Sequence, residues 1–524
     1  MDDIYDVIAV GSGINSLVLA AQLSLRGKRV LVLERESIPG GCLKSAELTL
    51  PGYRHDVFAT SVPAFVTAPH YGSLGPALAQ EGLKVLTGDR PTAVLTPDGR
   101  SLVLTRDRQS NILELDAVDD GDGKAFARAM AEIKRDGYMI DAFLGSEVLG
   151  RANVLAIFKL WRQRGVTGMS QFGGNSLRSL REWLEDDFRS DLPRALIAPW
   201  ILHCGLDPEA PMSAMMGKLI LSLIESAGAP VIEGGIANLV EALGRIIARS
   251  EGRISCDQHV ERVQVKNGRA TGVITADGAI YSARRAVACN VTPQQLYGAL
   301  LQDAHVPPNL ASAARSYRYG RSGMQIHLAL SEPASWRDPA LNDVALVHLT
   351  AGLDAVSCAT NEAARGLLPS EPTIVVGQPT TVDPSRCPPG AGILWLQLLE
   401  LPSAPKADAS GEISVDPDRG WTLELKNAYA ERVLDRLSVA IPQLRSTILG
   451  SHILSPSDLA KQNINLVGGD PYSGACGIEQ FHWFRPPTAG SHRTSIRNLY
   501  HIGASSHPGP SVAGLSGHIV STLV

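Results

Sequence analysis

The residues with the clearest capacity for chemistry lie near the start of the chain, in the segment GSGINS at 11–16 and at Glu34. Glycines in a tight turn let the backbone approach a phosphate, and the free N–H groups at the start of the following helix favour negative charge. An acidic residue about 20 positions further on is suited to hydrogen-bond a ribose. This spacing predicts a turn that binds a dinucleotide.

The segments around this turn match the strand–turn–helix–strand unit that such a site requires. Residues 6–10 are a short apolar run typical of a buried parallel strand, apolar residues follow at helical spacing over 14–25, and a second apolar strand is expected at 29–33. Ser16 stands where a third glycine is usual, and its small side chain still permits close packing of helix and strand. The alternative interpretation is an ordinary βαβ unit that binds no nucleotide.

Two more glycine-rich segments are expected to face a ligand. One is PGGC at 39–42, directly after the second strand. The other is GASSHPG at 503–509, which follows a strand at 498–502 and leads through PSVAG at 510–514 into a final helix. Between these segments, strand signals over 258–288 with Asn-Gly and Asp-Gly turns predict a three-stranded meander.

Composition narrows the class of protein. A chain of 524 residues is too long for one compact core, and its net charge of −5 indicates no nucleic-acid surface. No run of 18 apolar residues is present, so no membrane-spanning helix is expected, and the N-terminus enters the first strand without a signal peptide. Seven scattered cysteines, and histidines without metal-ligand spacing, argue against disulfides, a redox dithiol and a metal site. The expected location is the cytoplasm.

The order of the segments predicts an α/β fold with two interleaved domains. A Rossmann-like nucleotide-binding domain, with a parallel sheet and the meander, is expected from residues 1–62, 230–295 and 465–524. An α+β substrate-binding domain is expected from residues 63–229 and 296–464. A Pro-Asp-Gly turn at 97–99 predicts a hairpin within the second domain.

Two apolar stripes lie within the expected substrate domain. The first runs over 154–164 and carries three basic residues, and the second runs over 212–224 and contains three methionines. Both are typical of a core-facing helix. The alternatives are an apolar substrate channel and, for 154–164, a basic amphipathic surface that contacts the cytoplasmic face of a membrane.

Together these motifs resemble the phytoene desaturase-like flavoproteins of the amine-oxidase superfamily. The resemblance rests on GSGINSLVLAAQLSLRGKRVLVLE, PGGCLKS, the meander at 258–288 and LYHIGASSHPGPSVAG. The segments PVIEGG, VDPSRCPPG and GGDPYSG also resemble the bacterial branch near the pyridine nucleotide-disulphide oxidoreductase domain proteins. The nucleotide-binding segments carry most of this resemblance, and the substrate segments carry little of it.

The resemblance implies non-covalent FAD, with Glu34 at the adenosine ribose, Arg35 beside the adenine and the backbone of Val260 against the adenine. No second GxGxxG is present, so a tightly held NAD(P) is not expected. Cys42 departs from the arginine of many superfamily members, and Ser505-Ser506 departs from an acidic residue that binds the ribityl chain. The implied cofactor-binding residues are Gly11, Ser12, Gly13, Ile14, Asn15, Ser16, Glu34, Arg35, Gly40, Gly41, Cys42, Ser45, Val260, Gly503, Ala504, Pro508, Gly509, Val512 and Gly514.

The implied activity is an FAD-dependent desaturase or oxidase that removes a hydride and a proton across a C–C bond of a mostly apolar or alicyclic substrate. The hydride passes to flavin N5, and oxygen, a quinone or another carrier accepts the electrons. The N-terminus of the helix after 509–514 would stabilise negative charge at flavin N1.

Three side chains are candidates for a catalytic role. Tyr472 could donate to a carbonyl or act as a base, with plain packing as the alternative. His507 lies within residues 503–514, the flavin segment, and the alternative for it is a structural hydrogen bond. Arg485, with His482 and Trp483 close by in the sequence, could pair with a substrate carboxylate or form a salt bridge between domains.

Two other functions stay open. A carotenoid-type isomerase would use the flavin without net redox change. An escort-type binding protein has the same fold and first motif without redox chemistry, although the glycine pair at 40–41 and the intact segment 503–514 argue against it. A flavin spectrum would exclude the escort function, and the mass of the product would separate a desaturase from an isomerase.

Overall fold

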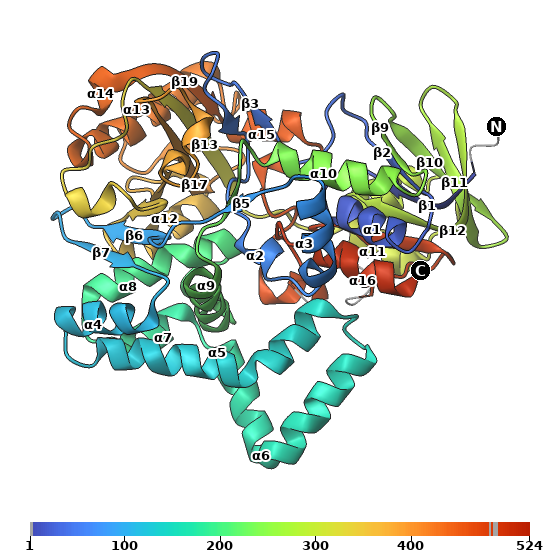
Figure 1. Ribbon diagram of the computed structural model, residues 1–524, viewed down its shortest axis with the longest axis horizontal. Coiled ribbons are helices and arrows are strands. Elements are labelled where there is room, and N and C mark those ends of the chain that lie inside the picture. The colour runs from blue at the N-terminus through green and yellow to red at the C-terminus, as the bar shows by residue number, and fades with distance from the viewer. Residues whose placement is uncertain (1–3, 482–483, 486–490) are drawn as a thin grey trace.

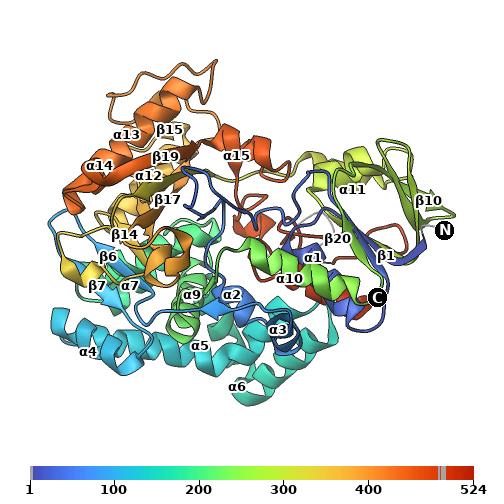
Figure 2. The same cartoon turned by 45° about the horizontal axis from the view of Figure 1, so that its top comes forward.

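The computed structural model describes residues 4–481, 484–485 and 491–524, and it contains two seven-stranded sheets flanked by helices (Figure 1). The first sheet lies at one end of the molecule beside α1 (Ile14–Ser24) and α10 (Ala237–Ala248). The second sheet lies at the opposite end, and Figure 2 shows the same separation after a turn of 45°.

The first sheet has the strand order β10-β11-β12-β1-β2-β9, with β20 paired to β12. Its parallel part consists of β1 (Ile4–Val10), β2 (Val30–Leu33), β9 (Arg253–Ser255), β12 (Ile280–Asn290) and β20 (Leu499–Ile502). All four residues of β2 are buried, as expected for a short apolar strand in a sheet that is covered on both faces. This sheet therefore takes strands from residues 4–33, 253–290 and 499–502.

The predicted three-stranded meander is confirmed. β10 (Val260–Lys266) pairs antiparallel with β11 (Arg269–Thr275), and β11 pairs antiparallel with β12. The first turn places Asn267 and Gly268 at φ of 52° and 70°. Asn and Gly tolerate this left-handed conformation better than other residues, which explains why the Asn-Gly pair marks the turn.

The second sheet has the order β19-β13-β17-β16-β14-β6-β7 and is antiparallel except at the β14–β6 pair. The predicted hairpin is formed by β6 (Thr92–Leu95) and β7 (Ser101–Leu104). The other strands are β13 (Ser322–Leu330), β14 (Leu346–Leu349), β16 (Ile374–Gly377), β17 (Gly392–Leu401) and β19 (Ile448–Leu454). All nine residues of β13 are buried, so this strand runs through the core of the second sheet.

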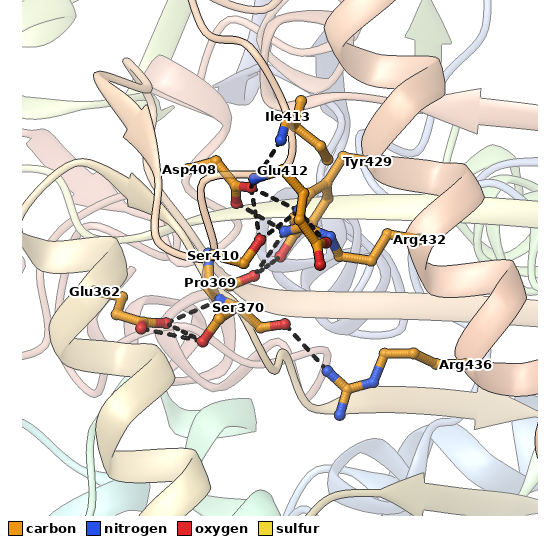
Figure 3. Close-up of polar contacts among 10 residues, drawn as sticks. All are labelled: Glu362, Pro369, Ser370, Asp408, Ser410, Glu412, Ile413, Tyr429, Arg432 and Arg436. Carbon is orange, nitrogen blue, oxygen red and sulfur yellow. Dashed lines mark hydrogen bonds and ion pairs between the residues drawn. The ribbon is translucent and has the colours of Figure 1, made fainter.

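A network of polar contacts fixes the loop before α13 (Leu423–Ala440) onto that helix (Figure 3). The buried Asp408 carboxylate accepts two hydrogen bonds from the Arg432 guanidinium, at 2.7 and 2.6 Å. The backbone N–H groups of Glu412 and Ile413 donate to the same carboxylate, each at 2.9 Å. Burial acts to raise the pKa of Asp408, but the hydrogen bonds from Arg432 and the backbone outweigh burial and lower it. The carboxylate is therefore charged and fully paired.

The two longest helices of the described residues are α5 (Asp122–Gly145) and α6 (Arg151–Leu177), and the shorter α9 (Ser213–Ala227) contacts both. Gly165 is non-helical, with φ of 63° and ψ of −170°, and it divides α6 into two arms that project as a V from the body of the molecule (Figure 1). No helix within the described ranges is long and apolar enough to cross a membrane.

The core interpretation of the first apolar stripe is wrong for most of its residues. Val154, Phe158 and Trp161 are 61%, 55% and 48% exposed, whereas Ile157 packs beside the small cluster between α5 and α6. The period of a helix indicates which residues share a face, but it does not indicate whether another element covers that face. The second stripe, on α9, faces the interior.

Candidate cofactor and substrate site

A continuous cavity of about 1050 Å³ runs from the first sheet to α9. Its volume lies slightly above the range of about 300–1,000 Å³ that is typical of a site for one small molecule. One end is lined by the turn at 11–15 together with Glu34 and Val260, the middle by residues 40–44, 504–505 and 508–513, and the far end by α9 and two tryptophans.

The N-terminus of α1 faces the cofactor end of this cavity. Its first residues, Ile14 and Asn15, line the cavity, and Gly13 at the N-cap position provides no side-chain cap. The first N–H groups of a helix have no partner within the helix, and they carry partial positive charge. An uncapped helix N-terminus at a glycine turn fits the pyrophosphate of a dinucleotide.

A chain of hydrogen bonds joins the first turn, Glu34 and the paired glycines. The backbone N–H and the hydroxyl of Ser12 donate to Glu34 Oε2 at 2.8 and 2.5 Å. The N–H of Gly40 donates to Ser12 Oγ at 2.8 Å, and the N–H of Glu36 donates to Glu34 Oε1 at 3.0 Å. Glu34 is buried and lines the cavity, so it fixes the backbone around the cofactor end and presents a carboxylate there.

Asn290, at the end of β12, approaches three glycines closely and was not predicted as a site residue. A Cβ at Gly13 would lie 2.9 Å from Asn290 Nδ2, and a Cβ at Gly503 would lie 2.3 Å from Asn290 Oδ1. The Asn290 amide also donates to Ser16 Oγ at 3.2 Å. The available signal was its position: β12 is parallel to β1, and ligands of α/β sheets bind beyond the carboxyl ends of such strands.

Most of the implied cofactor-binding residues line the cavity, and four do not. Ser16 faces Asn290, and the Ser45 hydroxyl donates to Asp56 Oδ1 at 2.6 Å. Gly503 and Gly514 are required by packing, because a Cβ at Gly514 would lie 2.5 Å from Val18. The lining members are Gly11, Ser12, Gly13, Ile14, Asn15, Glu34, Arg35, Gly40, Gly41, Cys42, Val260, Ala504, Pro508, Gly509 and Val512.

Cys42 stands at the middle of the cavity as a neutral thiol. Burial raises its pKa to about 11, and Asn463 Nδ2 donates to Cys42 Sγ at 3.4 Å. An arginine at this position would add a positive charge beside the cofactor, and Cys42 supplies none. The site is therefore less positive here than in the superfamily members with arginine.

Tyr472 is the one of the three catalytic candidates that lines the cavity. Its hydroxyl donates to the carbonyl of Leu202, and burial raises the pKa of Tyr472 well above its usual value. The phenol therefore stays protonated at neutral pH with its proton committed to a backbone carbonyl. This geometry suits a wall of the site rather than a general base.

Arg485 is fully buried and braces the flavin segment from behind. Its guanidinium donates to the carbonyls of Ala504 and Tyr472 at 2.8 and 2.7 Å, and to the carbonyls of Ala475 and Gln480 at 3.3 Å each. It does not line the cavity. The Arg485 guanidinium therefore contacts backbone carbonyls, which is a structural role, and not the substrate carboxylate that the sequence suggested. His482 and Trp483 lie outside the described residues.

His507 also lies behind the cavity wall. Its Nε2 is 3.2 Å from the carbonyl of Ser146, and its own carbonyl is 2.8 Å from His492 Nε2. His492 Nδ1 in turn lies 2.7 Å from Glu147 Oε1. These contacts tie the flavin segment to the turn between α5 and α6 and favour the structural alternative for His507.

The far end of the cavity is apolar. Its wall includes Trp200, Leu346 and Trp395, and the inner face of α9 completes it with Met216, Leu219, Ile220, Leu223 and Ile224. The second apolar stripe therefore forms a channel wall. No group of three metal-ligating side chains occurs among the residues that the structure describes. Sequence reasoning missed Trp200 and Trp395, because their positions on the wall arise from the tertiary fold.

Comparisons with known proteins give the same result as the motifs. A model for an NAD(P)-binding Rossmann-like domain matches residues 10–71. The mouse pyridine nucleotide-disulfide oxidoreductase domain-containing protein 2 is 26% identical over 99% of this chain and 93% of its own length. A lycopene-forming phytoene desaturase from Paracoccus is 29% identical over 58% of this chain and 56% of its own length. One chain of the limonene dehydrogenase of Castellaniella defragrans is 23% identical over 99% of this chain and 94% of its own length.

The chain is an FAD-dependent oxidoreductase that is similar to the phytoene desaturases. The relatives confirm the resemblance that the motifs indicate, together with the predicted FAD cofactor and oxidoreductase class. The fold is also that of cyclohexylamine oxidase from Brevibacterium oxydans, with a TM-score of 0.59, 16% identity and coverage of 99% of this chain and 98% of that one. The predicted Rossmann-like domain with an interleaved second domain is thereby confirmed.

Proposed function

We propose that this desaturase-like protein removes a hydride and a proton from adjacent carbons of a mostly apolar or alicyclic substrate, which leaves a C=C bond. The hydride passes to the flavin and the proton passes to a water molecule at the mouth of the cavity. The observation that carries the proposal is the continuous cavity that joins the cofactor end to the apolar wall of α9. FAD, when bound, accepts the hydride and later passes two electrons to oxygen or a quinone. A likeness to limonene dehydrogenase and phytoene desaturase supports a hydrocarbon substrate.

The protein's own residues would bind, orient and shield the substrate. The side chains of α9 and the two tryptophans exclude water from the far end, where burial of apolar surface stabilises a bound hydrocarbon by about 25 cal/mol for each Å². The flavin segment, through residues 504–505 and 508–513, forms the wall between the two ends. Tyr472 stays protonated and contributes shape, so the wall around it supplies no strong base.

A substrate screen with product analysis tests this function. The FAD-loaded protein is incubated with limonene and phytoene, with either oxygen or a soluble quinone as acceptor, and the products are analysed by mass spectrometry. We expect a product two hydrogens lighter than its substrate with at least one pair. A product of unchanged mass would instead support the isomerase function, and a protein that binds no flavin would support the escort function.

We also propose that the two arms of α6 contact an anionic membrane surface. The segment 151–177 carries four basic residues and no acidic one, and it exposes Leu155 and Val166 at 66% and 72% in addition to the exposed first stripe. Exposed apolar side chains flanked by basic ones are typical of helices that lie in a membrane interface. The end of α5, which leads into α6, lines the cavity at Ile140 and Leu144. An apolar substrate could thus enter beside the membrane surface.

Vesicle sedimentation tests this contact. The variant Phe158→Glu/Trp161→Glu should lose binding to vesicles that contain phosphatidylglycerol, while its flavin content stays that of the wild type. A matched control is Leu423→Glu, because Leu423 is 63% exposed on a different helix, α13. Equal sedimentation of all three proteins would contradict the proposed role of α6.

A further inference from the structure

The apolar end of the cavity contains a pair of histidines that neither the motifs nor the relatives assign. His203 lines the cavity and is partly exposed to it, whereas His348, on β14, is fully buried behind it. Their Nε2 atoms lie 3.2 Å apart, within hydrogen-bonding distance. Trp200 packs against both rings, with centroid distances of 4.8 and 4.9 Å.

Both rings are neutral at physiological pH. Burial lowers the pKa of His203 to about 4, and burial together with the neighbouring His203 lowers the pKa of His348 well below its usual value. One of the two Nε2 atoms must therefore carry the shared proton, and the other must accept it. Because a neutral imidazole carries one N–H group, each arrangement also decides which Nδ1 atom is a donor and which is an acceptor.

The surroundings of His348 favour one arrangement. His348 Nδ1 is buried and has no hydrogen-bond partner in the described part of the chain. If His348 Nε2 donates, its Nδ1 is a bare acceptor, whereas in the other arrangement Nδ1 carries an N–H group that points at no acceptor. Orphaned buried N–H groups are rarer than under-satisfied acceptors. His203 would then accept at Nε2 and carry its own proton on Nδ1.

His203 Nδ1 has no hydrogen-bond partner in the ranges that the structure describes, and its side chain borders the cavity. The wall around it includes Trp200, Leu346 and α9, and the Trp200 indole N–H is also buried without a partner among the described residues. A few N–H donors in a mostly apolar wall are the arrangement by which binding sites orient an otherwise apolar ligand. Hydrogen bonds also link the neighbouring Leu202 to residue 504, because the Leu202 carbonyl accepts from Tyr472, and Arg485 donates to the carbonyls of both Tyr472 and Ala504.

We propose that His203, oriented by His348, donates a hydrogen bond to a carbonyl, ether or hydroxyl oxygen of the substrate. This inference rests on the proposed function and adds that the site favours apolar molecules with one oxygen function over plain hydrocarbons of the same shape. His203 is then the residue that discriminates an oxygenated terpenoid-like molecule from the plain hydrocarbon. His348 acts as a positioning residue, because it sets which nitrogen of His203 carries the proton.

A matched pair of probes tests the inference by binding alone. Menthone and p-menthane differ by one carbonyl oxygen, and headspace gas chromatography measures the free concentration of each above the FAD-loaded protein. The reference is the ratio in which an apolar solvent takes up the two probes from water. We expect wild-type protein to exceed this ratio in favour of menthone by about three- to tenfold, the factor expected from one neutral hydrogen bond. In His203→Phe this excess should disappear, with binding of p-menthane unchanged.

Two further variants separate recognition from misfolding. His203→Asn keeps an N–H donor near the position of Nδ1 and should restore part of the preference. His348→Phe should lower the preference while the protein keeps its flavin content. An unchanged preference in His203→Phe, with normal flavin content, would overturn the inference. If no substrate reduces the flavin but the menthone preference still depends on His203, the proposed function fails and the inference stands.

Discussion

Ser12 connects the two glycine turns at the cofactor end, so Ser12→Ala is expected to weaken FAD binding with little change to the surrounding fold. The substitution removes the hydroxyl that donates to Glu34 at 2.5 Å and accepts from the N–H of Gly40 at 2.8 Å. A hydrogen bond to a charged group contributes about 1.5–3 kcal/mol, and an orphaned buried N–H costs about 1–3 kcal/mol. These contacts hold the turns in the protein without FAD, so part of the loss falls on folding stability.

We therefore expect the dissociation constant for FAD to rise by about 10- to 100-fold, which corresponds to about 1.4–2.8 kcal/mol. The assay is a titration of the deflavinated protein with FAD, followed by the change in flavin fluorescence. The matched control is Ser24→Ala at the end of the following helix, α1, because the Ser24 hydroxyl is buried and has no partner among the described residues. The account is refuted if Ser12→Ala binds FAD as tightly as Ser24→Ala does.

Three further predictions concern stability. His70→Phe should stabilise the protein under acidic conditions. Burial lowers the pKa of His70 from 6.5 to about 3. Below pH 6.5 the unfolded state therefore takes up a proton that the folded state does not, and the free energy of unfolding of the wild type falls. Over the 1.5 pH units down to pH 5 this loss is about 2 kcal/mol, and urea unfolding at pH 5 and pH 8 should show the gain of the variant chiefly at pH 5. Asp408→Ala should lower the free energy of unfolding by about 3–5 kcal/mol, because it leaves the Arg432 guanidinium without its buried partner, while FAD affinity stays unchanged. Arg485→Met should lower both the melting temperature and the flavin content, since it orphans the Ala504 and Tyr472 carbonyls behind the flavin segment; wild-type flavin content would contradict this role.

Local chemistry made the cofactor end predictable from the sequence. The GSG turn, Glu34 and the paired glycines each need a particular backbone conformation or charge, and few residue types supply these at that spacing. Gly11, Gly40 and Gly41 indeed adopt φ values of 83°, 115° and 61°. The Asn-Gly turn of the meander was predictable for the same reason.

Features that depend on distant partners were not predictable from the sequence. Arg485 is a charged residue that a sequence pattern places in a salt bridge or at an anionic ligand, yet the fold surrounds it with carbonyls. Asn290 and His203 carry no local signal, because their roles arise from strands and helices that meet only in the folded chain. The exposed face of α6 has the same periodicity as a core helix, and only the absence of a covering element among the described residues distinguishes the two.

The central claim is that flavin and an apolar substrate bind in one cavity and that a hydride passes from the substrate to the flavin. In the most direct measurement, the FAD-loaded protein is mixed with excess limonene or a related terpenoid under anaerobic conditions. The absorbance of the flavin is followed at about 450 nm. The account predicts that the absorbance of oxidised flavin disappears, with one product molecule, two hydrogens lighter, for each flavin. Flavin that stays oxidised while every candidate substrate is bound and recovered unchanged would contradict it.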